Sequence, residues 1–431
     1  MRNTQYIRRK QRLLALKPLL LVLALLVMIG GGLLIQKSPA LSWRYMVADT
    51  WIRGMIDPIE AMPTAHSANT SAPMDGVVTA TPTLNQPPTA TPIPPTPTAI
   101  PEVSPTPTFT PTALPPSVML TPPEWEKQGI NSCGPTTLSM LLRYYKWKGD
   151  QKTIEALVKP KDDDRNVNVD ELVMASRNLA GYLKTLFRVG GTNELLKQLI
   201  AAGYPVMIEE GFKMSETYYA GDDRWSGHYL LVTGYDDAKG VFVAQDSFVG
   251  PNQVYEYDKL GYTWQFFNYV YVIAYPPEDE EKIKAILGPN WDEDENRKLA
   301  LEASQQATID EPENPFAWYN YGNNLTYFEN YGQAALAFDE ARALKLPQRT
   351  LRYQFHPFFA YFYVNRLDDL MELTAYALKI TPNSEEALLW RGWGNYRLGK
   401  RDAALRDFQA ALAARPGYTD AEYAIKFLSE N

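Results

Sequence analysis

The hydrophobic pattern changes character three times along this chain of 431 residues. Residues 18–35 form one apolar run without a charged side chain. Between about 120 and 277, apolar positions at helical spacing are followed by short apolar strands. From about 290 to 431, stretches rich in alanine and tyrosine repeat at helical spacing. This order predicts a membrane-inserted segment, an α+β domain and an all-α domain.

The first apolar run has the length of a membrane-spanning helix. Its 18 residues would extend about 27 Å, close to the roughly 30 Å of a bilayer's hydrocarbon core. Residues 1–17 carry six Lys and Arg and no acidic residue, which predicts a cytoplasmic basic tail, with residues 18–36 as a single-pass signal anchor. A cleaved signal peptide is the alternative, because Ser38–Pro39–Ala40 suits a cleavage site, although the run is long for one.

Two segments separate this span from the first domain. Residues 37–62 carry an apolar stripe with charges elsewhere on the wheel, which predicts a juxtamembrane amphipathic segment; a short helix packed on the globular domain is equally consistent. Residues 63–119 are expected to be disordered, since 13 of the 38 residues from 79 to 116 are Pro and 11 are Thr. Such a sequence favours extended polyproline II, which predicts a stalk holding the later domains up to about 100 Å from the membrane.

Residues 120–277 are predicted to fold as an α+β domain. Helices are expected after Cys133 and at 150–158, 168–180 and 192–202, followed by strands at 206–208, 225–235, 241–246 and 269–275. A five-residue loop containing glycine joins the second and third of these strands, which indicates an antiparallel hairpin.

Cys133 is the only cysteine, so it has no partner for an intrachain disulfide. It precedes an apolar helical pattern, with Ser132 or Asn131 expected to cap the helix and Pro135 suited to its first turn. A thiol at a helix N-terminus is favoured as thiolate. A small buried hydrophobe is the alternative interpretation.

A cysteine nucleophile requires a base and a group that orients the base. Of the three histidines, only His228 lies in this domain; His66 receives no role and His356 is interpreted as structural. A hairpin centred on Asp237 would place Asp246 opposite His228, able to fix its tautomer. The N–H of Cys133 and the side-chain amide of Gln128 would supply oxyanion donors. Each residue alone has a structural explanation, but together they indicate a Cys-His-Asp triad.

These residues resemble the papain-like cysteine peptidases of the bacteriocin-processing (double-glycine leader peptidase) superfamily. The resemblance is carried by Gln128, Asn131–Ser132–Cys133–Gly134–Pro135–Thr136–Thr137, Gly227–His228–Tyr229, Gly234–Tyr235–Asp236–Asp237 and Gln245–Asp246–Ser247. It implies a papain-like fold, with Cys133 as nucleophile, His228 as base, Asp246 as orienting group and Gln128 in the oxyanion hole. The chain has no ATP-binding cassette or multi-span domain, so it resembles the free-standing branch. Residues 222–225, just before His228, are expected to line the cleft.

No metal or cofactor is expected. The acidic run at 162–164 resembles a calcium loop but lacks the central glycine and the closing glutamate, where Val173 stands. One cysteine and scattered histidines provide no zinc cluster. The formal net charge of −8 argues against nucleic acid as a partner.

Residues 290–431 resemble tetratricopeptide repeats, which are stacked helix–turn–helix units. In two copies, Trp318, Gly322, Ala334, Phe338 and Ala341 recur as Leu388, Gly392, Ala404, Phe408 and Ala411, with Leu370, Thr374, Ala377 and Pro382 in a degenerate copy between them. Tyr418 to Leu428 are expected to form a capping helix. The predicted role of this solenoid is a concave surface for a peptide or a partner protein; a scaffold for the neighbouring domain is the alternative.

Together these features predict a membrane-tethered extracellular cysteine peptidase, with repeats that recruit a substrate or partner. Two alternatives remain: a catalytically inactive peptide-binding or assembly protein, and an acyltransferase or amidase that uses the same thioester.

Overall fold

A sheet of seven strands forms the centre of the first domain. The computed structural model describes residues 58–66 and 114–430, together with 52, 55 and 56; within the longer range it leaves out 160, 162–165, 218 and 220. The strands are β1 (Ser117–Met119), β2 (Lys184–Arg188), β3 (Val206–Lys213), β4 (Trp225–Asp236), β5 (Val241–Asp246), β6 (Gly250–Glu256) and β7 (Tyr271–Tyr275). They run antiparallel in the order β2-β7-β3-β4-β5-β6, with β1 paired to β4.

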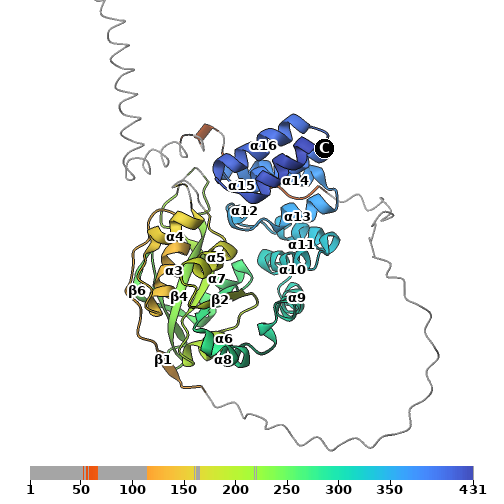
Figure 1. The fold of residues 1–431 in the computed structure, drawn as a ribbon. Helices are drawn as coiled ribbons and strands as arrows, with labels where there is room; N and C mark the ends of the chain where they lie inside the picture. The colour runs from red at the N-terminus through yellow and green to blue at the C-terminus, as the bar shows by residue number, and fades with distance from the viewer. Residues whose placement is uncertain are drawn as a thin grey trace, which may run out of the picture.

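Helices cover both faces of this sheet (Figure 1). They are α3 (Cys133–Tyr144), α4 (Gln151–Val158), α5 (Val169–Leu179), α6 (Asn193–Ala201), α7 (Tyr257–Trp264) and α8 (Glu280–Leu287). Along β3, Met207 packs with α3 to α5, whereas Val206 and Ile208 pack with α6 to α8. Because successive side chains of a strand point to opposite faces, the continuous apolar runs of β3, β5 and β7 fit a sheet buried on both sides.

The structure confirms a mixed α+β domain with an antiparallel sheet, and it adds elements that the hydrophobic pattern did not predict. The unpredicted elements are β1, β2, β6, α7 and α8. Strand β6 is a mostly exposed edge strand with the sequence GPNQVYE, so it has neither an apolar run nor a clear alternation. The predicted strand at 206–208 continues to Lys213, through Glu209 and Glu210, whose charges suggested its end.

The C-terminal part consists of antiparallel helix pairs. Its helices are α9 (Glu293–Asp310), α10 (Pro315–Tyr327), α11 (Tyr331–Ala343), α12 (Thr350–Tyr353), α13 (His356–Tyr363), α14 (Leu367–Ile380), α15 (Glu385–Arg397), α16 (Arg401–Ala414) and α17 (Thr419–Glu430). The predicted repeat positions meet in space: a Cβ on Gly322 would lie 2.6 Å from the Phe338 ring, and one on Gly392 would lie 2.4 Å from the Phe408 ring. Each glycine therefore lets an aromatic ring fill the space between paired helices.

An aromatic and ionic interface joins the repeats to the sheet domain. Trp225, at the start of β4, stacks on Phe316 of α10 and meets Tyr353 of α12 edge-on. Arg349 donates to Asp222 at 2.7 Å, and both side chains are almost completely buried. Either charge would be costly to bury without the other. This ion pair therefore fixes the position of the repeats against the sheet domain.

The two ends of the predicted stalk contact the folded body. Residues 58–66 lie against the repeats in a non-helical conformation, and β1 pairs with β4, where the hydroxyl of Tyr235 donates to the carbonyl of Pro115. This differs from the expectation that all of 63–119 is disordered. Among the described residues, no helix combines the length and hydrophobicity needed to cross a bilayer, and the predicted span at 18–36 lies outside them.

We predict that Gly392→Ala destabilises the protein by about 1–3 kcal/mol, because the new methyl group would overlap the buried Phe408 ring. Gly332→Ala, on the exposed side of α11 with no atom within 4 Å of the new Cβ, should be neutral or stabilising by about 0.5–1 kcal/mol. Urea unfolding of both variants checks this, and equal effects would contradict the assigned packing.

Candidate active site

Cys133 is the first residue of α3, and its side chain is partly exposed. Ser132 occupies the N-cap position, but the predicted capping bond is not formed, because the Ser132 hydroxyl donates to the carbonyl of Ile130 instead. The N–H groups at the start of α3 are therefore not taken up by a capping side chain. They remain directed along the helix axis, where they favour negative charge.

Close packing sets the position of this helix end against the sheet. Gly134 lies under Tyr229, and a Cβ there would come within 3.3 Å of the tyrosine ring. The hydroxyl of Thr137 donates to the carbonyl of Tyr229 at 3.1 Å. Since Tyr229 follows His228 on β4, these contacts hold Cys133 at the same level of the sheet as His228.

A β-bulge brings Asp246 to the face that carries His228. The predicted hairpin had Asp246 directly opposite His228, but Asp246 pairs with Leu230, and His228 pairs with Glu210 of β3. The register shifts between Val232 and Gly234, where Thr233 is the extra residue. Without this residue, Asp246 would pair with position 231 and its side chain would point to the opposite face. With it, His228 and Asp246 are diagonal neighbours.

The Asp246 carboxylate has hydrogen-bond donors at both oxygens. Its Oδ1 accepts from His228 Nε2 at 2.9 Å and from the amides of Phe248 and Val249 at 2.7 and 3.0 Å. Its Oδ2 accepts from the Tyr255 hydroxyl at 2.7 Å. Burial alone would raise the pKa of Asp246, but the hydrogen bonds and the charge of His228 outweigh it and lower the pKa to about 2.

His228 is buried between this carboxylate and the thiol. Burial lowers the pKa of His228, whereas hydrogen bonds to Asp246 and Cys133 and the charges of both raise it, with a net value of about 10. The Asp246 carboxylate therefore favours the charged imidazolium form of the ring. With Nε2 bound to Asp246, the other ring nitrogen is left for the contact with Cys133.

The predicted oxyanion donor Gln128 lines the same pocket as Cys133. The side-chain oxygen of Gln128, Oε1, accepts from the Ser247 hydroxyl at 2.8 Å, and the backbone N–H of Gln128 donates to the backbone carbonyl of Ser247. Because Ser247 binds the side-chain oxygen of Gln128, the side-chain nitrogen of Gln128 points away from Ser247. The four predicted site residues therefore lie together, three at the pocket and Asp246 behind His228.

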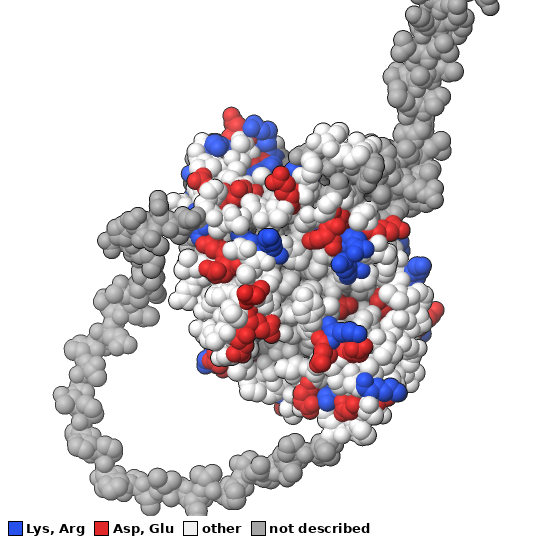
Figure 2. Space-filling model, turned by 180° about the vertical axis from the view of Figure 1, so that it is seen from behind, with Lys and Arg blue, Asp and Glu red and all other residues white. Residues whose placement is uncertain are grey.

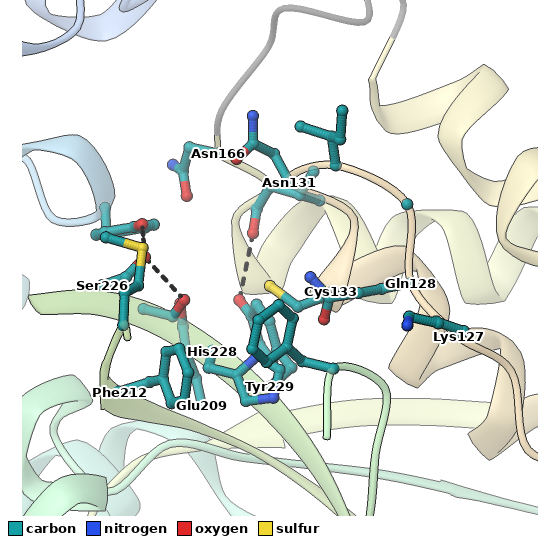
Figure 3. Close-up of a pocket in the computed structure, with 18 of the residues that line it drawn as sticks. Lys127, Gln128, Asn131, Cys133, Asn166, Glu209, Phe212, Ser226, His228 and Tyr229 are labelled. Carbon is teal, nitrogen blue, oxygen red and sulfur yellow. Dashed lines mark hydrogen bonds between the residues drawn. The ribbon is translucent and has the colours of Figure 1, made fainter. Parts of the chain in front are cut away.

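A pocket of about 480 Å³ opens over these groups. Figure 3 shows Gln128 and Cys133 on the α3 side and Phe212 and His228 on the sheet side. The repeats contribute to its wall through Tyr353, whose hydroxyl is 2.7 Å from Ser226 Oγ. Residues 222–225 do not line it, contrary to their predicted position, because they turn toward the repeats, where Arg349 binds Asp222.

Two acidic residues at the site were missed by sequence reasoning. Glu209 lines the pocket, and burial raises its pKa well above the usual value. Glu210 is the strand partner of His228, and burial raises its pKa to about 7. The sequence signal for them is a pair of acidic residues that directly follows an apolar strand. If the strand continues, both carboxylates become buried, and a buried carboxylate requires a polar partner.

The remaining sequence candidates lie elsewhere. The acidic run at 162–164 is outside the described residues. His356 begins α13, and burial lowers its pKa to about 4. Within the described part of the chain, His66, Asp369 and Glu372 form the one group spaced for a metal ion, but Arg342 is already paired with both carboxylates.

Comparison with known proteins identifies the sheet domain. Residues 117–274 match the model of the Peptidase_C39 like family, which confirms the predicted resemblance to this class of peptidases. No curated protein matches the chain.

Three similar solved structures cover the two parts separately. A C39-like peptidase from Bacillus anthracis is 15% identical and covers 37% of this chain and 97% of its own, with a TM-score of 0.30. A double glycine motif protease of an AMS/PCAT transporter, in complex with the leader peptide, is 16% identical over 37% and 94%, with a TM-score of 0.27. The Arabidopsis OM64 TPR domain is 21% identical over 30% and 98%, with a TM-score of 0.25.

We predict that Asp246→Asn lowers the free energy of unfolding most at pH 6 and progressively less as the pH approaches 10. The folded pKa of His228, about 10, lies above the usual value of 6.5. Its stabilising contribution is therefore complete below pH 6.5 and is lost as the pH rises through the folded pKa. Urea unfolding at pH 6, 8 and 10 measures the difference from wild type.

Tyr255→Phe is the matched control, because it removes one hydrogen bond to the same carboxylate without changing a charge. Its effect should be constant between pH 6 and 8, below the range in which the tyrosine of the unfolded chain titrates. A pH-independent effect of Asp246→Asn would show that His228 is not charged in the folded protein.

Proposed function

We propose that this chain is a papain-like cysteine peptidase that hydrolyses peptide bonds through Cys133, His228 and Asp246. The observation that carries the proposal is the arrangement of these groups at one pocket: a thiol at a helix N-terminus, a buried histidine and a buried carboxylate 2.9 Å from that histidine. The match of residues 117–274 to a peptidase family supports it. The ring of His228 and the N-terminal end of α3 both lie beside the sulfur, an environment that suits a cysteine nucleophile.

In the first half-reaction, the Cys133 sulfur attacks the carbonyl carbon of the peptide bond. The carbonyl electron pair moves to oxygen, where the N–H of Cys133 and the amide of Gln128 stabilise the charge. As this intermediate collapses, the C–N bond breaks and His228 transfers its proton to the leaving amine. A thioester on Cys133 remains.

In the second half-reaction, neutral His228 takes a proton from water, and the water oxygen attacks the thioester carbon. The C–S bond breaks, the acid product leaves, and the thiolate and imidazolium are restored. Asp246 holds the ring in orientation and stabilises its positive charge throughout, because its own pKa is too low for it to take the proton.

The proposed substrate is a peptide or protein, bound between the α3 side of the pocket and the aromatic side chains beside His228. The Phe212 ring lies 5.4 Å from the His228 ring and 5.5 Å from the Phe248 ring, so an apolar wall adjoins the base. Acidic and basic side chains are interspersed on the face seen in Figure 2, with no continuous basic patch, which supports a partner other than nucleic acid.

We place this peptidase outside the cell, tethered to the membrane. The proposal rests on the apolar run at 18–35 and the basic residues before it. The repeats would then present a protein-binding surface on the same side of the membrane as the pocket.

We predict that iodoacetamide modifies Cys133 faster than a free thiol near neutral pH, and that His228→Ala slows this reaction sharply. The same substitution should lower peptide hydrolysis by about 10²–10⁴-fold, because it removes the group that protonates the leaving amine. Since Cys133 is the only cysteine, intact-mass spectrometry follows the modification without ambiguity. Modification of wild type at the rate of a free thiol would contradict the proposal.

Gln128→Ala separates oxyanion stabilisation from thiol activation. It should lower hydrolysis by about 10²–10³-fold and leave alkylation unchanged, because alkylation forms no oxyanion. Gln306→Ala, an exposed glutamine of α9, should change neither rate. An equal loss of both rates in Gln128→Ala would assign the residue to thiol activation instead.

We predict that a membrane-impermeant maleimide labels Cys133 in intact cells, and that the labelled protein stays with the membrane fraction after an alkaline wash. Permeabilised cells give the total that can be labelled. Labelling only after permeabilisation would contradict the extracellular location, and a shortened labelled form in the medium would indicate a cleaved signal.

A further inference from the structure

A segment that precedes the Pro/Thr-rich region is bound to the surface of the repeats. Residues 58–66, here called the docked segment, run in a non-helical conformation with a bend at Ala61 against α14, where Figure 1 draws them in red-orange. Their side chains Ile59 and Met62 are 9% and 4% exposed and belong to the apolar cluster that the repeats form with residues of the sheet domain such as Trp225. Proline stands at positions 58 and 63, which favours the extended form before binding.

The repeats bind the backbone of this segment along its length. Lys379 donates to the carbonyl of Pro58 at 3.0 Å, Tyr376 to that of Glu60 at 3.3 Å, Arg342 Nε to that of Pro63 at 2.9 Å and Arg366 to that of His66 at 3.4 Å, while Asp369 accepts from the His66 amide at 3.1 Å. These partners come from α11 and α14 and the residue just before α14. The arrangement is that of a groove for a non-helical peptide.

Buried charges at the centre of the groove indicate a site built for a ligand. Arg342 is 1% exposed and Asp369 is 3% exposed, and they form an ion pair at 2.9 Å. Each uses a further polar atom on the docked segment, Arg342 at a carbonyl and Asp369 at an amide. A charged side chain this deeply buried requires all its polar atoms to be satisfied, and the segment supplies part of that requirement.

We propose that residues 58–66 are the built-in ligand of the repeat groove. The groove selects a non-helical peptide that carries two apolar side chains three residues apart, as Ile59 and Met62 are. An external partner of the groove must first displace this segment, whose effective concentration is set by its covalent attachment to the chain. The proposal does not depend on the activity of Cys133.

The docked segment changes the geometry of the membrane tether. Residue 66 is held on the repeats and residue 115 on the sheet domain, so both flanks of the Pro/Thr-rich region are attached to the folded body. The distance from a membrane span at 18–36 to the body is then set by residues 37–57 alone.

A labelled synthetic peptide with the sequence of residues 56–67 tests the proposal, with the full chain in detergent micelles. Wild type should bind the peptide weakly, because its own segment competes. The double variant Ile59→Asp/Met62→Asp releases that segment and should bind the peptide about tenfold or more tightly. Fluorescence anisotropy measures the two dissociation constants, and equal affinities would overturn the proposal.

Two controls match this experiment. Met55→Asp/Ile56→Asp makes the same chemical changes at residues that are 52% and 79% exposed, and it should bind the peptide as weakly as wild type does. A peptide with Asp at the positions of Ile59 and Met62 should not bind the released variant. Binding of that altered peptide with undiminished affinity would overturn the predicted selectivity.

Hydrogen exchange of the wild-type protein gives a test that does not depend on any variant folding. The amide of His66 donates to Asp369 and should exchange slowly at every protein concentration. Fast exchange at His66 would overturn the docking. If protection of His66 appeared only as the protein concentration rises, the bound segment would come from a second copy of the chain. That result would overturn the proposal that the segment docks within its own chain.

Discussion

The candidate site depends on the buried carboxylate of Asp246, which fixes the ring of His228. Four donors from three parts of the chain meet at this group: a strand histidine, two amides of the following turn and a tyrosine of β6. All four donors bind the negatively charged oxygens, so the carboxylate stays ionised and stabilises the positive charge of the His228 ring beside it. Cys133 then meets a positive ring on one side and the N-terminal end of α3 on the other.

The repeats take part in this arrangement as well as binding the docked segment. Gly227, the residue before His228, has no room for a side chain, because Phe267 and Tyr353 lie against it. Trp225 and the buried pair of Arg349 and Asp222 hold the start of β4 on the repeats. The strand that carries the base is therefore supported by sheet pairing on its flanks and by the repeats at its beginning.

Much of this architecture follows from local patterns in the sequence, and the rest depends on contacts that patterns do not encode. Local patterns predicted the helix after Cys133, the strand with His228 and the glycine–phenylalanine pairs of the repeats. Regularly spaced apolar residues indicate the helix and the strand, and small residues indicate close packing between helices. The predicted hairpin register was wrong, because the turn is centred between Ala238 and Lys239 and not on Asp237, and the bulge at Thr233 then shifts the pairing by one residue. The docking of Ile59 and Met62 was not predicted, since two apolar residues in a polar stretch give no periodicity.

The most direct test of the central arrangement is the protonation state of His228. The chain has three histidines, so ring ¹⁵N spectra of histidine-labelled protein contain few signals and single substitutions assign them. We expect His228 to be doubly protonated at pH 7 and to lose its proton only near pH 10, while His356, with a pKa of about 4, is neutral at pH 7 and serves as the internal reference. A neutral ring at His228 at pH 7 would contradict the charge pair on which the proposed mechanism rests.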